Sequence, residues 1–180
     1  MLQVTVPDIE LFDDANEEFI YVKGQTLQLE HSLVSLRKWE SKWCKPFLSK
    51  VDKTDEELRD YIRCMTLTQN VNPDIYKYLT DDIVRKIYAY IEAPMTATTI
   101  NEEKSSKRNN RVVTAELIYY WMISLNIPSE YQKWHLNSLL TLIRVCNIEN
   151  TPPKKRSKKD IMSRNAALNA ARRQQLNSKG

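Results

Sequence analysis

The chain has 180 residues, of which 42% are hydrophobic, so it is long enough for one compact domain and an extension. Its only two glycines, Gly24 and Gly180, argue against a glycine-rich phosphate loop, a turn-rich β-sandwich or another glycine-dependent cofactor motif. The net charge of +4 is unevenly distributed: residues 152–180 carry nine basic residues and one acid, a net +8, whereas residues 1–151 carry 18 basic and 22 acidic residues, a net −4.

Residues 1–29 are predicted to form a small antiparallel β element. Leu2, Val4 and Val6 alternate with polar neighbours, as in a half-buried strand. Two further extended segments, 9–12 and 18–22, flank the polar sequence DDAN, which is suited to a hairpin turn.

Between residues 30 and 150 the hydrophobic period becomes helical and predicts a helical body. Apolar residues three or four apart predict a first helix that ends before Pro46. Thr54 and Glu57 form a capping box at the start of a second helix, and Thr80, followed by two acids, is the predicted cap of a later one.

The second half of this body begins after a polar segment, residues 101–111, which is predicted to be an exposed and mobile loop. A helix over residues 113–125 is apolar almost all round and is expected in the middle of the core. Ser129 with Gln132 is a second capping-box pattern, predicted to open one helix that runs through residue 145. The predicted core of the body contains Trp39, Leu58, Ile62, Ile87, Trp121, Leu139 and Leu142.

Residues 151–180 are predicted to be a basic linker and a tail helix. The helix, over residues 161–176 with Ser157 and Asp160 as its cap, has few large apolar residues, so it is marginal alone and is expected to order on a partner. The candidate partner-binding residues are Lys154, Lys155, Arg156, Lys158, Lys159, Arg164, Arg172 and Arg173.

The anionic partner of this tail is left open between nucleic acid and an acidic protein surface. The tail has no aromatic residue to stack on bases and no DNA-binding motif, so nucleic-acid binding would be weak, salt-sensitive and sequence-independent.

The residues that commonly carry chemistry show no pattern typical of an active site. His31 and His135 are about a hundred residues apart, each is placed on a helix, and no close His/Cys spacing indicates a metal site. The three cysteines are interpreted as reduced core residues. A His–Cys pair that meets in space stays open, but the sequence predicts no catalytic, cofactor-binding or metal residue.

Targeting and membrane segments are not expected either. The N-terminus lacks a basic region followed by an apolar one, which predicts that there is no signal peptide. The longest apolar stretch, 117–125, is about half of the ~20 residues that span a bilayer. The sequence therefore predicts a soluble, intracellular protein.

Several segments together carry a resemblance to a known group of proteins. They are LQLEHSL (27–33), KWESKW (38–43), YIRCMT (61–66), PMTATT (94–99), YYWM (119–122), QKWHLN (132–137) and SRNAALNAARR (163–173). Over nearly its whole length the chain resembles small proteins of long-tailed bacteriophages and prophages that look like tail assembly chaperones.

This resemblance implies a non-enzymatic function in the cytoplasm of the bacterial host cell. The protein would bind the tape measure protein, and in some cases the tail tube protein, while tail tube subunits assemble; no catalytic residue comes with the family. The alternative is a virion structural or packaging component whose basic tail contacts DNA or the connector. An enzyme is a third hypothesis without a supporting motif, and self-association stays open.

Overall fold

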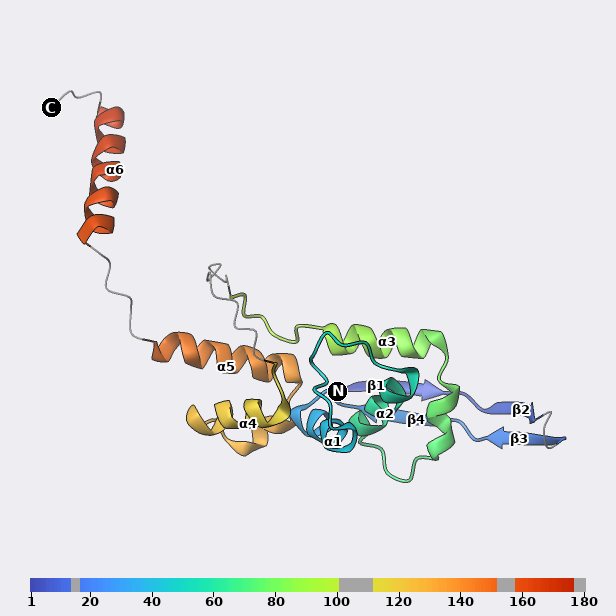
Figure 1. The fold of residues 1–180 in the computed structure, drawn as a ribbon. Helices are drawn as coiled ribbons and strands as arrows, with labels where there is room; N and C mark the ends of the chain where they lie inside the picture. The colour runs from blue at the N-terminus through green and yellow to red at the C-terminus, as the bar shows by residue number, and fades with distance from the viewer. Residues whose placement is uncertain (14–16, 101–111, 152–157, 177–180) are drawn as a thin grey trace. The chain divides into compact units, whose positions relative to one another are not determined.

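The computed structural model describes residues 1–13, 17–100, 112–151 and 158–176 (Figure 1). The chain divides into two compact units, Met1–Asn147 and Ile148–Gly180. The predicted mainly helical fold with antiparallel strands at the N-terminus is confirmed. The predicted loop 101–111 lies outside the described residues.

Four strands form two antiparallel pairs. The predicted hairpin is β2 (Ile9–Asp13) with β3 (Glu18–Val22), and β1 (Leu2–Val6) pairs with β4 (Gln25–Leu29). Gly24 lies where the chain leaves the hairpin, and a Cβ there would meet the backbone carbonyl carbon of Pro7 at 2.5 Å. This close backbone approach explains one of the two glycines.

Two helices follow the strands, and capping explains where each begins. α1 (Leu33–Trp43) begins after Ser32, whose hydroxyl accepts from the backbone N–H of Ser35. α2 (Asp55–Met65) begins with the predicted capping box: Thr54 Oγ1 accepts from the N–H of Glu57, and the Glu57 carboxylate accepts from the N–H of Thr54.

The next segment contains the short 3-10 helix η1 (Pro73–Tyr78) and α3 (Asp81–Glu92). Thr80 occupies the cap position of α3, but its side chain makes no capping hydrogen bond. Thr80 is therefore at the predicted cap position but lacks the hydrogen bond of a cap. The two acids of the first turn supply the favourable interaction with the helix dipole.

Two predictions for the second half of the body are wrong in part. α4 (Ala115–Ser124) is not surrounded by core, because Tyr120 and Ile123 are 63% and 76% exposed. The single helix predicted from Ser129 is divided into the 3-10 helix η2 (Ser129–Lys133) and α5 (Leu136–Asn150). The helix breaks because His135 instead forms a β-bridge with Ser32.

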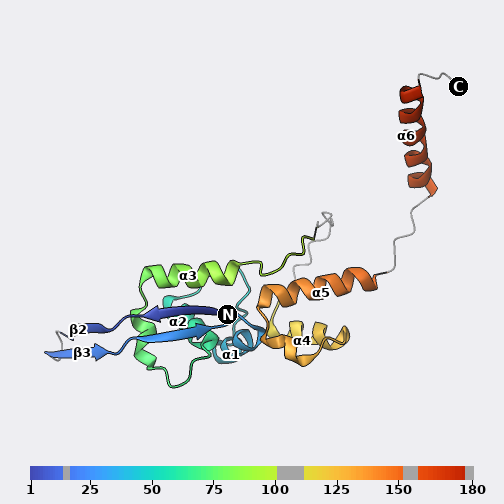
Figure 2. The ribbon, with the colours of Figure 1, turned by 180° about the vertical axis from the view of Figure 1, so that it is seen from behind.

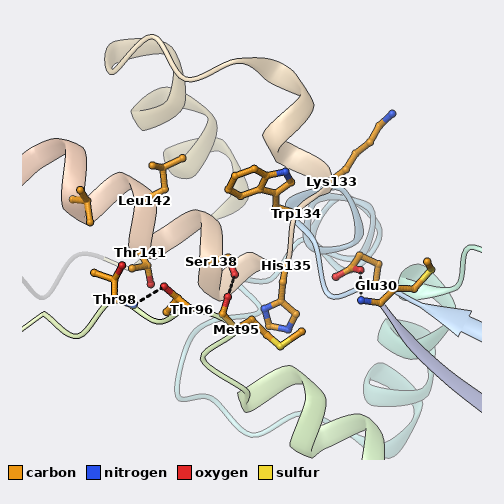
Figure 3. Close-up of a pocket in the computed structure, with 12 residues that line it drawn as sticks. Glu30, Met95, Thr96, Thr98, Lys133, Trp134, His135, Ser138, Thr141 and Leu142 are labelled. Atoms are coloured by element: carbon orange, nitrogen blue, oxygen red, sulfur yellow. Dashed lines mark hydrogen bonds and ion pairs between the residues drawn. The ribbon is translucent and has the colours of Figure 1, made fainter.

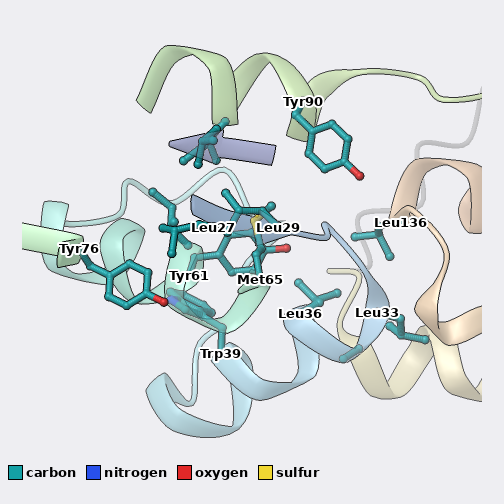
Figure 4. Close-up of a cluster of buried hydrophobic side chains, with 14 of the residues drawn as sticks. Leu27, Leu29, Leu33, Leu36, Trp39, Tyr61, Met65, Tyr76, Tyr90 and Leu136 are labelled. Atoms are coloured by element: carbon teal, nitrogen blue, oxygen red, sulfur yellow. The ribbon is translucent and has the colours of Figure 1, made fainter. Parts of the chain in front are cut away.

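The core of the Met1–Asn147 unit lies between the β1–β4 pair and the helices (Figure 4). Of the predicted core residues, Trp39, Ile62, Ile87 and Leu139 are buried, and Leu58, Trp121 and Leu142 are half-buried. Four of the seven placements are thus confirmed in full, and none of the seven is exposed. Figure 4 shows side chains from β4, α1 and α2 meeting in this core.

A buried carboxylate joins two helices of this unit. Glu40, on α1, accepts from the backbone N–H of Ala115 at 2.7 Å and from that of Phe47 at 2.9 Å. It therefore supplies an acceptor to the first turn of α4, whose amides have no partner within the helix. Burial raises the pKa of this carboxyl.

The Ile148–Gly180 unit contains the predicted tail helix, α6 (Lys158–Leu176). All residues of α6 from 162 to 176 are exposed. Among the helices that the structure describes, none is long and apolar enough to cross a membrane.

Candidate functional site

The two histidines lie together in the interior of the Met1–Asn147 unit. The ring centroids of His31 and His135 are 5.1 Å apart, and the residues are only 2% and 7% exposed. Neither lies on a helix, which corrects the placement made from the sequence: His31 lies between β4 and α1, and His135 between η2 and α5. The Leu136 N–H also donates to the His31 carbonyl at 2.7 Å, so the two segments are joined through their backbones.

The hydrogen bonds of His135 define its protonation state. Its Nε2 lies 3.0 Å from the carbonyl oxygen of Tyr90, which can only accept, so Nε2 carries a proton. Its Nδ1 accepts from the N–H of Asn137 at 3.3 Å. A second proton on Nδ1 would face this donor, and burial likewise lowers the pKa of His135.

His31 is also held neutral. Its Nδ1 lies 2.6 Å from the hydroxyl of Tyr61, a fully buried side chain. Burial, and then the proximity of His135, lower the pKa of His31 from 6.5 to about 3. Burial raises the pKa of Tyr61, so the phenol keeps its proton and its hydrogen bond with His31 joins two neutral groups.

A pocket of about 590 Å³ opens beside His135 (Figure 3). Trp134, Ser138 and Leu142 line it from the α5 side, and the segment after α3, including Met95, lines the other. The Ser138 hydroxyl donates to the carbonyl of Met95. This hydrogen bond joins the segment after α3 to α5.

Metal ligation was not predicted, and the described residues contain no group of three or more His, Cys, Asp or Glu that could hold an ion. The three cysteines are free, but only Cys64 and Cys146 are partly buried. Cys44 is exposed, which corrects the core placement made for it from the sequence. It is the C-cap of α1 and has the left-handed conformation, with φ of 51°.

Exposed apolar side chains on α4 form a second candidate surface. Tyr120 and Ile123 are three residues apart and therefore project from the same face of the helix. The opposite side, with Ile118 and Met122, is buried. Large apolar side chains that remain exposed on one face are typical of protein-binding surfaces.

The structure places only part of the predicted basic site. Lys154, Lys155 and Arg156 lie outside the described residues. Lys158 and Lys159 belong to the first turn of α6. Arg164, Arg172 and Arg173 are exposed on α6. They belong to the Ile148–Gly180 unit, whereas the histidine pair belongs to the Met1–Asn147 unit.

Sequence reasoning missed the contact between the histidines. The available signal was local: each histidine stands within two residues of the first apolar residue of a helix, in HSL and in HL. No spacing rule relates positions this far apart. Comparison of the chain with protein families, with characterised proteins and with solved structures gives no match.

Proposed function

We propose that the chain is a non-enzymatic, protein-binding factor that acts as a phage tail assembly chaperone in the cytoplasm of the bacterial host cell. Its client would be the tape measure protein, with the tail tube protein as a further partner. The observation that carries the proposal is the exposed apolar face of α4, Tyr120 and Ile123, on a helix whose composition is that of a buried one.

Two features support this assignment over a catalytic role. The buried histidines form hydrogen bonds with other groups of the protein and hold the fold together, so a structural role explains them without a catalytic one. A chaperone also needs an accessible apolar surface for a client rich in apolar helix faces, and α4 offers one on a well-packed support. The resemblance of the sequence to tail assembly chaperones points to the same class.

The test is co-expression with the candidate tape measure protein followed by pull-down. Replacing Tyr120 and Ile123 together by serine should reduce the captured client by about tenfold, because it removes apolar contact area. The matched control replaces Val51 and Leu67, which are also exposed (69% and 55%), by serine and should leave capture unchanged. Equal capture by the wild type and by the α4 variant would remove α4 from the proposal.

The alternative is a virion structural or packaging component whose basic tail contacts DNA or the connector. The exposed arginines of α6, Arg164, Arg172 and Arg173, are the observation that favours it. Mass spectrometry of purified virions separates the two functions, because a chaperone should be absent from the mature particle. Tight, tail-dependent gel shifts with arbitrary duplex DNA, without capture of the tape measure protein, would favour the alternative.

A further inference from the structure

The β2–β3 hairpin is an arm that extends beyond the helices of its unit (Figures 1 and 2). The two strands pack chiefly on each other, and only Val22, at the base of the arm, is fully buried among the arm side chains that the structure describes. A two-stranded hairpin without further packing is marginally stable in water. A partner that covers the exposed surface of the arm would therefore stabilise the hairpin.

Three of the exposed side chains of the arm are aromatic. Phe12 and Phe19 lie directly opposite each other in the register, with ring centroids 5.0 Å apart, and are 52% and 71% exposed. Tyr21, two residues after Phe19 and so on the same face, is 63% exposed. One face of the arm thus carries an aromatic patch made of three rings, with Glu10 on the same face, opposite Tyr21.

The negative net charge of the arm indicates a positively charged partner. Residues 8–23 contain six acids and one lysine, a net −5, whereas residues 152–180 carry +8. The basic helix α6 also exposes large apolar side chains, Met162, Leu168 and Leu176. Its 19 residues are about 28 Å long, enough to cover a five-residue strand of about 17 Å.

We propose that the arm of one copy of this chain binds the tail helix α6 of a second copy, through the aromatic patch and the opposite charges. This contact goes beyond the proposed function and does not depend on the identity of the client. The contact would stabilise both the arm and the helix, because a free helix poor in large apolar residues is, like the hairpin, only marginally stable in water.

A second copy fits better than the chain's own tail. α5, from which the tail continues, lies at the end of its unit opposite to the arm (Figures 1 and 2).

Analytical ultracentrifugation of the full-length protein tests the proposal. The wild type should self-associate, and the dissociation constant should rise by about tenfold or more between about 0.05 M and 0.5 M NaCl, because salt screens the opposite charges. The apolar contact is tested with Phe19→Ser, which should weaken association by about tenfold while the helical body keeps its melting temperature. A wild type that stays monomeric at low salt contradicts the proposal.

Charge-reversal variants identify the surfaces. Glu10→Lys with Glu17→Lys, and separately Arg172→Glu with Arg173→Glu, should each weaken self-association by about tenfold. An equimolar mixture of the two variants should associate more tightly than either alone, because the basic tail of the first still matches the acidic arm of the second. The control, Lys50→Glu with Lys86→Glu, changes the net charge as the tail variant does, at exposed body positions.

The control should self-associate like the wild type. Equal weakening by the control and the tail variant would mean that net charge alone acts, and failure of the mixture to associate would exclude contact between arm and tail of different copies. Neither result bears on capture of the tape measure protein, so this inference and the proposed function fail independently.

Discussion

Protonation of the buried histidine pair is disfavoured by both burial and hydrogen bonding. His31 Nδ1 and the Tyr61 hydroxyl share a hydrogen bond, and His135 uses one nitrogen as donor and the other as acceptor. A charged imidazole in this position would lose the acceptor role and would lie beside a second imidazole. The pair is therefore a neutral link between the segment that precedes α1 and the segment that precedes α5.

The first prediction concerns the pH dependence of stability. The pKa of His31 is about 3 in the folded chain and 6.5 in the unfolded chain, so the unfolded state binds more protons between these values. The stabilising contribution is complete above pH 6.5 and is lost as the pH falls toward 3. Between about pH 7 and pH 5, the free energy of unfolding should fall by about 2 kcal/mol from His31 alone.

Urea unfolding at several pH values measures this change. The control is His31→Gln, which keeps a polar side chain next to Tyr61 but does not titrate. Its free energy of unfolding should be lower near neutral pH and should vary less with pH. Equal slopes for the variant and the wild type over this range would show that His31 is not held neutral.

At the scale of single elements, side-chain capping explains several helix starts but not all. Thr54 and Glu57 satisfy each other's backbone amides at the start of α2. Thr80 has the same residue type in the same position at the start of α3, yet makes no such bond. The two threonines are both exposed, so they form a matched pair.

The second prediction uses this pair. Thr54→Ala should lower the free energy of unfolding by about 1 kcal/mol, because the amide of Glu57 loses its acceptor and the capping box is broken. Thr80→Ala should lower it by less than about half of that, since no capping bond is lost. Urea titrations of the two variants give the comparison. A larger loss for Thr80→Ala would show that its cap forms in solution.

At the scale of the whole molecule, the chain consists of a packed unit and a basic unit with different physical character. The Met1–Asn147 unit has one core, to which strands β1 and β4 and the helices contribute. The described residues of α6 beyond residue 161 are all exposed and bury no side chain. The helix α6 has few large apolar residues, so we expect the first unit to fold without it.

The third prediction follows from this division. Deleting residues 152–180 should change the melting temperature by less than about 2 °C, since a change of 1 kcal/mol corresponds to about 2–4 °C in a chain of this size. Differential scanning calorimetry at low protein concentration, where self-association is small, gives the comparison. A decrease of more than about 5 °C would mean that the tail packs against the body.

The sequence by itself determined the features that depend on local interactions. The alternation at Val4 and Val6, the capping box at Thr54 and the concentration of positive charge after residue 152 each involve neighbours within a few residues. Such neighbours are in contact whatever the rest of the chain does, so their pattern can be interpreted directly. The mainly helical fold and four fully buried core residues followed from them.

Only the tertiary structure decided which distant segments meet. The contact between His31 and His135, the break before α5 and the exposure of Ile123 depend on which surface lies opposite each residue. Periodicity shows that one side of a helix is apolar, but it does not show whether a neighbour covers that side. The candidate functional surfaces of this protein are of this second kind, because a surface is defined by what the folded chain leaves uncovered.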